Sequence, residues 1–179
     1  MQFSALPHCD HELVLLRPLR PADLPDWYAY LSLPQVYEHT SWNLDSVDGL
    51  VSYLPGTEPT TPSTRLRMAI ALRSTGELVG TGGFHSVSPE NRSAEIAYDL
   101  SPSMWGRGIA SHVCAALTAW AHAEAGVVRV QATTLESNSR SAKVLERCGY
   151  KREGLLRSFR MVRGRPGNFF MYSHLAGEA

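Results

Sequence analysis

The most informative residues of this sequence are two glycines, Gly106 and Gly108, which lie where a predicted strand ends and a helix begins and could form a binding site. A helix start leaves about four N–H groups without acceptors and carries partial positive charge. Glycines let an anion approach those groups unobstructed, and Arg107 can add a cationic contact. The pattern favours a phosphate site. A tight turn with no ligand explains the two glycines equally well.

The glycine spacing differs from the two common nucleotide signatures. The segment lacks the third glycine of a dinucleotide-binding fold, and it lacks the Gly-Lys-Ser/Thr of a P-loop. The strand before it also ends an expected antiparallel meander, whereas nucleotide loops usually follow parallel strands. A nucleotide-binding protein that holds ATP at this turn is therefore a third reading, behind the two considered below.

Hydrophobic periodicity and turn residues predict about seven strands and about four helices. Strands are expected over 12–19, 66–72, 78–87, 94–100, 127–135, 154–162 and 169–175. Helices are expected from residue 21, over 46–54, from 109 until Gly126, and over 139–148. The order β-α-α-β-β-β-α-β-α-β-β predicts an α/β (α+β) fold with a mixed, mostly antiparallel sheet flanked by helices.

Length and charge narrow the class of protein. The chain has 179 residues, which suits one domain over 1–179, and its 17 basic and 17 acidic side chains balance to zero. We therefore expect no nucleic-acid partner. No signal peptide or membrane span is apparent, so we expect a cytoplasmic protein that binds no membrane. Residues 1–11 are expected to be a flexible terminus, and the histidines show no metal-site spacing, so no metal is expected.

Three motifs together resemble a known family. The first is Trp105-Gly106-Arg107-Gly108-Ile109-Ala110; the second is Asn138-Ser139-Arg140-Ser141 followed by Val144-Leu145-Glu146-Arg147-Cys148-Gly149-Tyr150; the third is Glu153-Gly154-x-Leu156-Arg157. In this order they resemble the GNAT superfamily of acyl-CoA N-acyltransferases. Trp105 departs from the family's usual Gln/Arg, but it is the form typical of the RimJ/RimL-like (ribosomal-protein-alanine N-acetyltransferase) branch.

The resemblance implies a GNAT-type sheet and acetyl-CoA (coenzyme A) as co-substrate. The pantetheine arm is then expected to pair with the backbone of Tyr98, Asp99 and Leu100. The pyrophosphate is expected over Gly106 and on the N–H groups of Arg107, Gly108, Ile109 and Ala110. Asn138 matches a cofactor contact, although its position equally suits a helix N-cap.

The resemblance also suggests catalytic residues. A tyrosine that serves the leaving thiolate in many members is replaced here by Leu145, and Ser141 matches the serine that takes its place in the RimJ/RimL-like branch. A helix-surface serine is the alternative for Ser141. Glu95 is the first choice for the general base, because a carboxylate in a partly buried cleft suits proton removal. An exposed strand carboxylate is its alternative, and His85 and Glu136 are weaker candidates.

The acceptor is expected to be a small-molecule or peptide amine. Tyr37, His39, Trp42 and His85 are the candidates to line its pocket, although Tyr37 and Trp42 could equally be core residues. The expected reaction is direct attack of a primary amine in a ternary complex. A non-catalytic acyl-CoA-binding module of the same fold is the second hypothesis, since Leu145 cannot donate a proton. Whether the protein forms a homodimer is left open.

Overall fold

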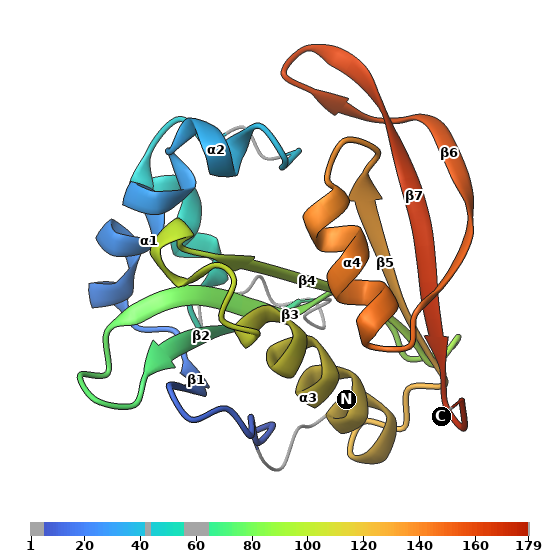
Figure 1. Cartoon of the computed structure of the whole chain (residues 1–179), viewed down its shortest axis with the longest axis horizontal. Helices are drawn as coiled ribbons and strands as arrows, with labels where there is room; N and C mark the ends of the chain where they lie inside the picture. Colours follow the sequence, from blue (N-terminus) through green and yellow to red (C-terminus); the bar gives the residue numbers. More distant parts are fainter. Residues whose placement is uncertain (1–5, 42–43, 56–64, 179) are drawn as a thin grey trace.

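The chain folds around a seven-stranded sheet of order β1-β2-β3-β4-β5-β7-β6 (Figure 1). The computed structural model describes residues 6–41, 44–55 and 65–178. The strands are β1 (Val14–Pro18), β2 (Leu66–Leu72), β3 (Leu78–Ser88), β4 (Ser93–Leu100), β5 (Arg129–Leu135), β6 (Lys151–Val162) and β7 (Arg165–Leu175). All neighbouring strands are antiparallel except β4 and β5. The expected mixed, mostly antiparallel fold is confirmed.

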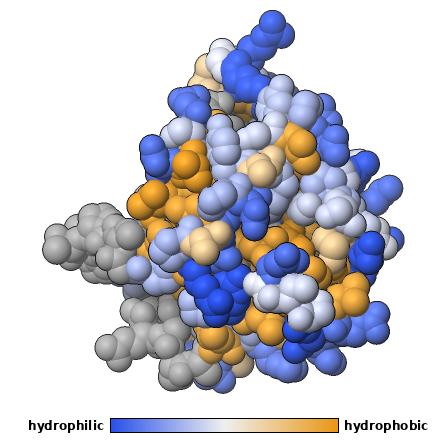
Figure 2. All heavy atoms as spheres, turned by 90° about the vertical axis from the view of Figure 1, so that its left-hand side faces the viewer, coloured by the Kyte–Doolittle hydropathy of each residue, from blue (hydrophilic) through white to orange (hydrophobic). Residues whose placement is uncertain are grey.

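Helices cover both faces of the sheet. They are α1 (Leu24–Leu31), α2 (Pro34–Tyr37), α3 (Ile109–Ala123) and α4 (Ser139–Arg147), with 3-10 turns η1 (Pro21–Asp23), η2 (Val47–Tyr53) and η3 (Pro102–Met104). Along β2 the side chains alternate, so that Met68 and Ile70 join the core cluster around α3 whereas Ala69 joins the cluster around α1. The α1 side has apolar side chains in scattered patches among polar ones (Figure 2).

Several boundaries differ from the sequence-based expectation. The segment 46–54 forms a 3-10 turn, and the second helix is the short α2. β5 begins at Arg129 because the N–H groups of Val127 and Val128 bond to Ala121 and Arg92. β6 and β7 form a longer hairpin than expected. Its two-residue turn, Arg163 and Gly164, has φ of 49° and 75°, which is the conformation of a type I′ hairpin.

The parallel contact between β4 and β5 is short. Register pairs run only from Ser93 to Glu95, opposite Arg129 to Gln131. β4 nevertheless continues to Leu100. Beyond Glu95 the two strands part, and the β5-facing edge of β4 has no partner strand in the described part of the chain. This is the opening to which the resemblance assigns the pantetheine arm.

The far end of β4 is fixed by the carboxylate of Asp99. It accepts hydrogen bonds from Thr81 Oγ1 at 2.7 Å and Trp27 Nε1 at 3.2 Å, and also from the side chains of Tyr30 and Arg67. Burial and the Asp99 charge raise the pKa of Tyr30 well above its usual value, so the phenol stays a donor. α1, β2 and β3 are thus tied to one carboxylate at the end of β4.

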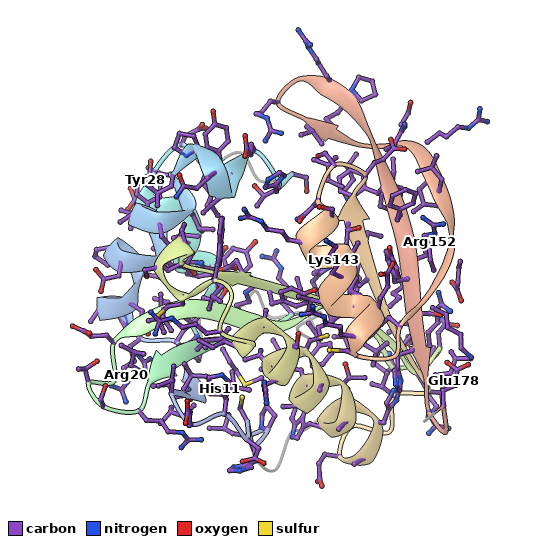
Figure 3. The ribbon with its side chains drawn as sticks, in the orientation of Figure 1. His11, Arg20, Tyr28, Lys143, Arg152 and Glu178 are labelled. Atoms are coloured by element: carbon purple, nitrogen blue, oxygen red, sulfur yellow. The ribbon has the colours of Figure 1, made fainter. Side chains whose placement is uncertain are left out.

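Two residues of the terminus that is expected to be flexible pack against the rest of the chain. Cys9 and His11 are buried. Arg73 donates to the carbonyls of Cys9 and His11 at 2.9 and 3.0 Å, and the His11 ring lies 3.0 Å from the carbonyl oxygen of Arg107. Figure 3 places His11 beside the start of α3. Residues 1–5 lie outside the described residues.

The third sequence motif has a structural role. Glu153 accepts a bidentate pair of hydrogen bonds from Arg129 at 2.9 and 2.6 Å and a third from Ser173 at 2.7 Å. These contacts hold β6 against β5 and β7. They also keep the pKa of Glu153 at about 2, below its ordinary value.

We therefore predict that Glu153→Gln lowers the free energy of unfolding in a pH-dependent way. Because the folded-state pKa is depressed, the stabilisation is complete above the unfolded pKa, roughly 4.3, and is lost as the pH falls towards 2. The side chain is 42% exposed, so the effect at pH 7 should be below about 1 kcal/mol. Urea unfolding at several pH values measures it.

The control is Glu124→Gln, whose carboxylate has no ion pair within the described ranges. It should show no such pH-dependent loss. A gap between the native protein and Glu153→Gln that stays constant from pH 7 to pH 3 would contradict the assignment.

Candidate active site

The glycine turn before α3 presents a row of backbone donors. None of the N–H groups from Gly106 to Ala110 has a protein acceptor among the described residues, and the first donors inside the helix are Ser111 and His112. Gly106 and Gly108 have φ of 77° and 78°, where other residues are strained. No heavy atom beyond its chain neighbours lies within 4 Å of the position that a Cβ would take on Gly106. The glycines therefore both shape the turn and leave space over it.

A groove of about 600 Å³ lies over this turn, between α2, the end of β4, α3 and α4. Its lining contains eight of the nine residues predicted to contact the cofactor: Tyr98, Asp99, Leu100, Gly106, Gly108, Ile109, Ala110 and Asn138. The ninth, Arg107, has an exposed side chain that does not line the groove. Its cationic contact with a phosphate stays a prediction, whereas its N–H belongs to the row.

The positive charge of the groove comes from α4. Arg140, Lys143 and Arg147 all line it, and their spacing of three and four residues places them on one helix face. Arg140 also lies 4.4 Å from the ring centre of Trp105, whose Nε1 donates to the Leu100 carbonyl at 2.8 Å. Figure 3 shows Lys143 on α4. The sequence analysis missed this cationic face, although the spacing is visible in the sequence.

Asn138 is the N-cap of α4. Its Oδ1 accepts from the Ser141 N–H at 3.0 Å, and its Nδ2 donates to the His39 carbonyl at 3.4 Å. The capping alternative is thus confirmed. Since Asn138 also lines the groove, the cap does not remove it from contact with a ligand there.

Ser141 lies beside the hydroxyl of Tyr98. Their oxygens are 3.1 Å apart, so one hydroxyl donates to the other. Burial raises the pKa of Tyr98 well above its usual value, which keeps its hydroxyl protonated. The single proton of Tyr98 has two acceptors within reach, the Ser141 carbonyl at 3.3 Å and the Ser141 hydroxyl at 3.1 Å. When Tyr98 donates to the hydroxyl, the Ser141 proton is available to a group in the groove. This tyrosine side chain was not part of the sequence-based proposal. Leu145, by contrast, is fully buried.

A second cavity, of about 140 Å³, lies beyond the parting of β4 and β5. It shares six lining residues with the groove: His39, Thr40, Tyr98, Asp99, Asn138 and Ser141. Glu95 and His85, cross-strand neighbours on β4 and β3, line the second cavity but not the groove. The two cavities therefore meet at Ser141, with the groove on one side and Glu95 on the other.

Glu95 is buried, so the alternative of an exposed strand carboxylate is wrong. It is 5% exposed, and its Oε1 accepts from Thr133 Oγ1 at 2.6 Å and from Arg160 Nη2 at 3.1 Å. Its Oε2 accepts no hydrogen bond from any described residue. Glu136, the weaker candidate, is exposed and lines neither cavity.

His85 lies 3.7 Å from Glu95 Oε1. Burial lowers the pKa of His85 below its usual value, Glu95 opposes this shift, and the charges of Arg160, Arg67 and Arg65 add to it. The imidazole is thus neutral near pH 7.

The remaining acceptor candidates have different positions. His39 lines both cavities, and its Nδ1 is buried without a partner in the described structure. Tyr37 is 41% exposed and lines neither cavity, so it is neither core nor pocket. Arg163, at the tip of the β6–β7 hairpin, donates to the carbonyls of Tyr37, Glu38 and Thr40 at 2.8 to 3.1 Å. Trp42 lies outside the described residues.

The described residues include neither a group suited to a metal ion nor a helix suited to a membrane. No group of three or more His, Cys, Asp or Glu side chains within the described ranges could hold a metal ion. Among the same residues no helix is both long enough and apolar enough to cross a membrane.

The site combines a splayed β4–β5 pair, a turn before α3 with N–H donors that lack acceptors, and a second cavity at the splay. This arrangement suits a reaction between an anionic ligand and a second substrate, and comparisons with known proteins identify its class. The model of the "Acetyltransferase (GNAT) domain" matches residues 14–151. The chain therefore belongs to the GNAT family, in its RimJ/RimL-type branch, and is an acetyl-CoA-dependent N-acetyltransferase.

Individual relatives support this assignment. The chain is 28% identical over 169 residues to the uncharacterized N-acetyltransferase YoaA of Bacillus subtilis, covering 93% of this chain and 96% of that protein. It is 35% identical over 112 residues to the uncharacterized N-acetyltransferase p20 of Bacillus licheniformis, 63% of each chain. The structure of Mycobacterium smegmatis RimJ in complex with CoA-disulfide superposes with a TM-score of 0.77 at 25% identity, covering 92% of this chain and 83% of that one.

The groove fits coenzyme A by its donors. Successive N–H groups without acceptors suit a pyrophosphate, and the cations of α4 suit additional phosphate oxygens. We predict that Gly108→Asp weakens CoA binding at least about 100-fold, because a carboxylate would occupy the place of the phosphate. Calorimetric titration with CoA measures the loss.

Gly108 has φ of 78°, so an aspartate there is also strained by roughly 1 kcal/mol. Gly76→Asp is the matched control. Gly76 has φ of 76° in the β2–β3 turn, lines none of the cavities described above, and has no heavy atom beyond its chain neighbours within 4 Å of its Cβ position. It should lose similar stability and keep CoA affinity. Unchanged affinity in Gly108→Asp would remove the turn from the cofactor site.

Proposed function

We propose that this enzyme acetylates a primary amine, of a small molecule or of a peptide N-terminus, by direct attack within a ternary complex. The observation that supports this most is the wall shared by the two cavities at Ser141 and Tyr98. A thioester held in the groove can meet an amine that enters from the Glu95 side. No acyl-enzyme intermediate is needed, since both substrates reach the same point.

The reaction forms a C–N bond and breaks the C–S bond. Acetyl-CoA supplies the thioester, whose carbonyl carbon is the electrophile. The electron pair of the broken bond stays on sulfur, and the amine loses one proton. The chain must therefore accept a proton on the acceptor side, polarise the carbonyl and stabilise the thiolate.

We propose Glu95 as the group that takes the proton, directly or through water. Its Oε2 faces no protein donor among the described residues, while Thr133 and Arg160 hold its other oxygen in place. Such fixed geometry suits a positioned base. The unpaired edge of β4 beyond Glu95 supplies backbone N–H groups that can polarise the carbonyl.

Ser141 is the proposed donor to the leaving thiolate. The hydroxyl of Tyr98, at 3.1 Å, can donate to Ser141 Oγ while the Ser141 proton turns to sulfur. This pair supports catalysis although Leu145 replaces the usual tyrosine. Positioning of the two substrates supplies additional rate.

The test of the proposal is thiol release from acetyl-CoA in the presence of amines. We expect release with at least one member of a panel of N-terminal peptides, amino acids, polyamines and aminoglycosides, with saturation in both substrates and intersecting initial-rate plots. Parallel plots would instead indicate an acyl-enzyme. CoA binding without thiol release for any amine would favour the acyl-CoA-binding module.

The base assignment predicts that Glu95→Gln lowers kcat about 100-fold with little change in CoA affinity. The control is Glu136→Gln, which alters an exposed carboxylate outside both cavities. It should keep full activity. Steady-state rates from pH 6 to 9 and a thermal melt of each variant make the comparison. Full activity of Glu95→Gln across this range would show that Glu95 is not the base.

A further inference from the structure

A third cavity, of about 330 Å³, adjoins the acceptor side of the site. It shares Arg67, His85, Ala97 and Arg160 with the cavity that contains Glu95. Its described lining is Tyr53, Arg65, Arg67, Phe84, His85, Ser86, Ala97 and Arg160, three arginines and no carboxylate. An acceptor amine near Glu95 would therefore extend into a cationic space.

Arg160 is the arginine best placed to bind a ligand. Its guanidinium lies 4.9 Å from the ring centre of Phe159 and 5.6 Å from that of Phe169, which fixes its plane. The side chain is 34% exposed, and Nη2 to Glu95 Oε1 is its one hydrogen bond within the described ranges. A guanidinium has five N–H donors in a planar fork, so donors remain for a ligand in the two cavities that Arg160 lines.

Of the other two arginines, Arg67 lies on β2, the neighbour of β3, and Arg65 lies just before β2. Arg67 is buried and donates to Thr81 and to the carbonyl of Ala97, in addition to its ion pair with Asp99. Arg65 lies over the ring of Tyr53, 5.3 Å from its centre. Two carboxylates of the described residues lie near the cavity, Glu95 and Asp99, and each is already paired with an arginine. Among the described residues at this end of the site, the charge balance is therefore positive, although the whole chain is neutral.

The charges of the three arginines create a positive electrostatic field, which lowers the pKa of His85. The same field acts on an acceptor. It disfavours an ammonium ion near Glu95, so it helps the amine to lose its proton before attack. It also disfavours a second positive charge on the acceptor, as a polyamine carries, and favours a negative one.

We infer that the acceptor amine of this enzyme carries a carboxylate or phosphate group, which Arg160 and Arg65 bind in the cavity beside Glu95. The inference rests on the proposed amine acetylation and names the class of its acceptor. Arg160 can form paired hydrogen bonds to either anion. Because the two cavities are adjacent, the anion and the amine belong to one compact molecule or to neighbouring residues of a peptide.

Matched acceptor pairs test the inference at saturating acetyl-CoA. The pairs are β-alanine with its amide, O-phosphoethanolamine with ethanolamine, and peptides that begin Ala-Glu or Ala-Gln; spermidine is the cationic comparison. At least one anionic member should exceed its neutral partner at least tenfold in kcat/KM. The pair that shows the preference distinguishes carboxylate, phosphate and peptide sources.

Two arginine variants locate the effect. Arg160→Gln and Arg65→Gln should each reduce the preference for the anionic member about tenfold, read as a ratio of kcat/KM values. The ratio cancels any general effect of Arg160 on Glu95, and Arg65 does not touch Glu95. The control is Arg152→Gln: Arg152 lies on β6 too, 4.9 Å from the ring centre of Phe170, on the outer side of the hairpin (Figure 3). It should leave the preference unchanged.

A binding measurement separates this inference from the proposed function. Calorimetric titration of the CoA-bound protein with each pair needs no turnover. Tighter binding of an anionic member, lost in Arg160→Gln and Arg65→Gln, supports the inference even where no thiol is released. Turnover that is equal or faster with the neutral partners overturns the inference and leaves amine acetylation standing. Equal binding within every pair, or no binding of any member, overturns it as well.

Discussion

The parting of β4 from β5 after Glu95 is the constraint on which the rest of the site depends. A strand edge inside a protein carries N–H and C=O groups that need partners. Here β5 pairs with β4 over only three residues, while β4 continues to Leu100. That edge opens both to the groove over the α3 turn and to the cavity with Glu95. The proposed cofactor site and the proposed acceptor site thus both depend on one break in the sheet.

The break is maintained by polar contacts at both of its ends. At the far end, the Asp99 carboxylate takes donors from β2, β3 and α1, so β4 cannot close towards β5 without uncovering a buried charge. At the near end, Arg160 from β6 reaches across to Glu95. Although the chain is formally neutral, its cations gather on α4 and beside His85, which are the two places proposed to bind the ligands.

Sequence reasoning predicted the elements better than the contacts between them. Periodicity predicted β2 to the residue, and the glycine turn was found because its requirement for positive φ is local. The ion pair of Glu95 was not predictable, because its partner on β6 lies 65 residues further along the chain. Arg160 was missed for the same reason. The role of Tyr98 was also hidden, since its hydroxyl partner Ser141 lies on another element.

The His11 ring is bonded to the carbonyl of Arg107. It therefore connects the N-terminal segment to the peptide units whose N–H groups make up the glycine turn before α3. Two events that share a peptide unit are thermodynamically linked, and the linkage is reciprocal. If occupancy of the turn tightens the docking of the segment around His11, docking of that segment must increase affinity at the turn by the same factor. The chain before β1 would then be part of the binding equilibrium.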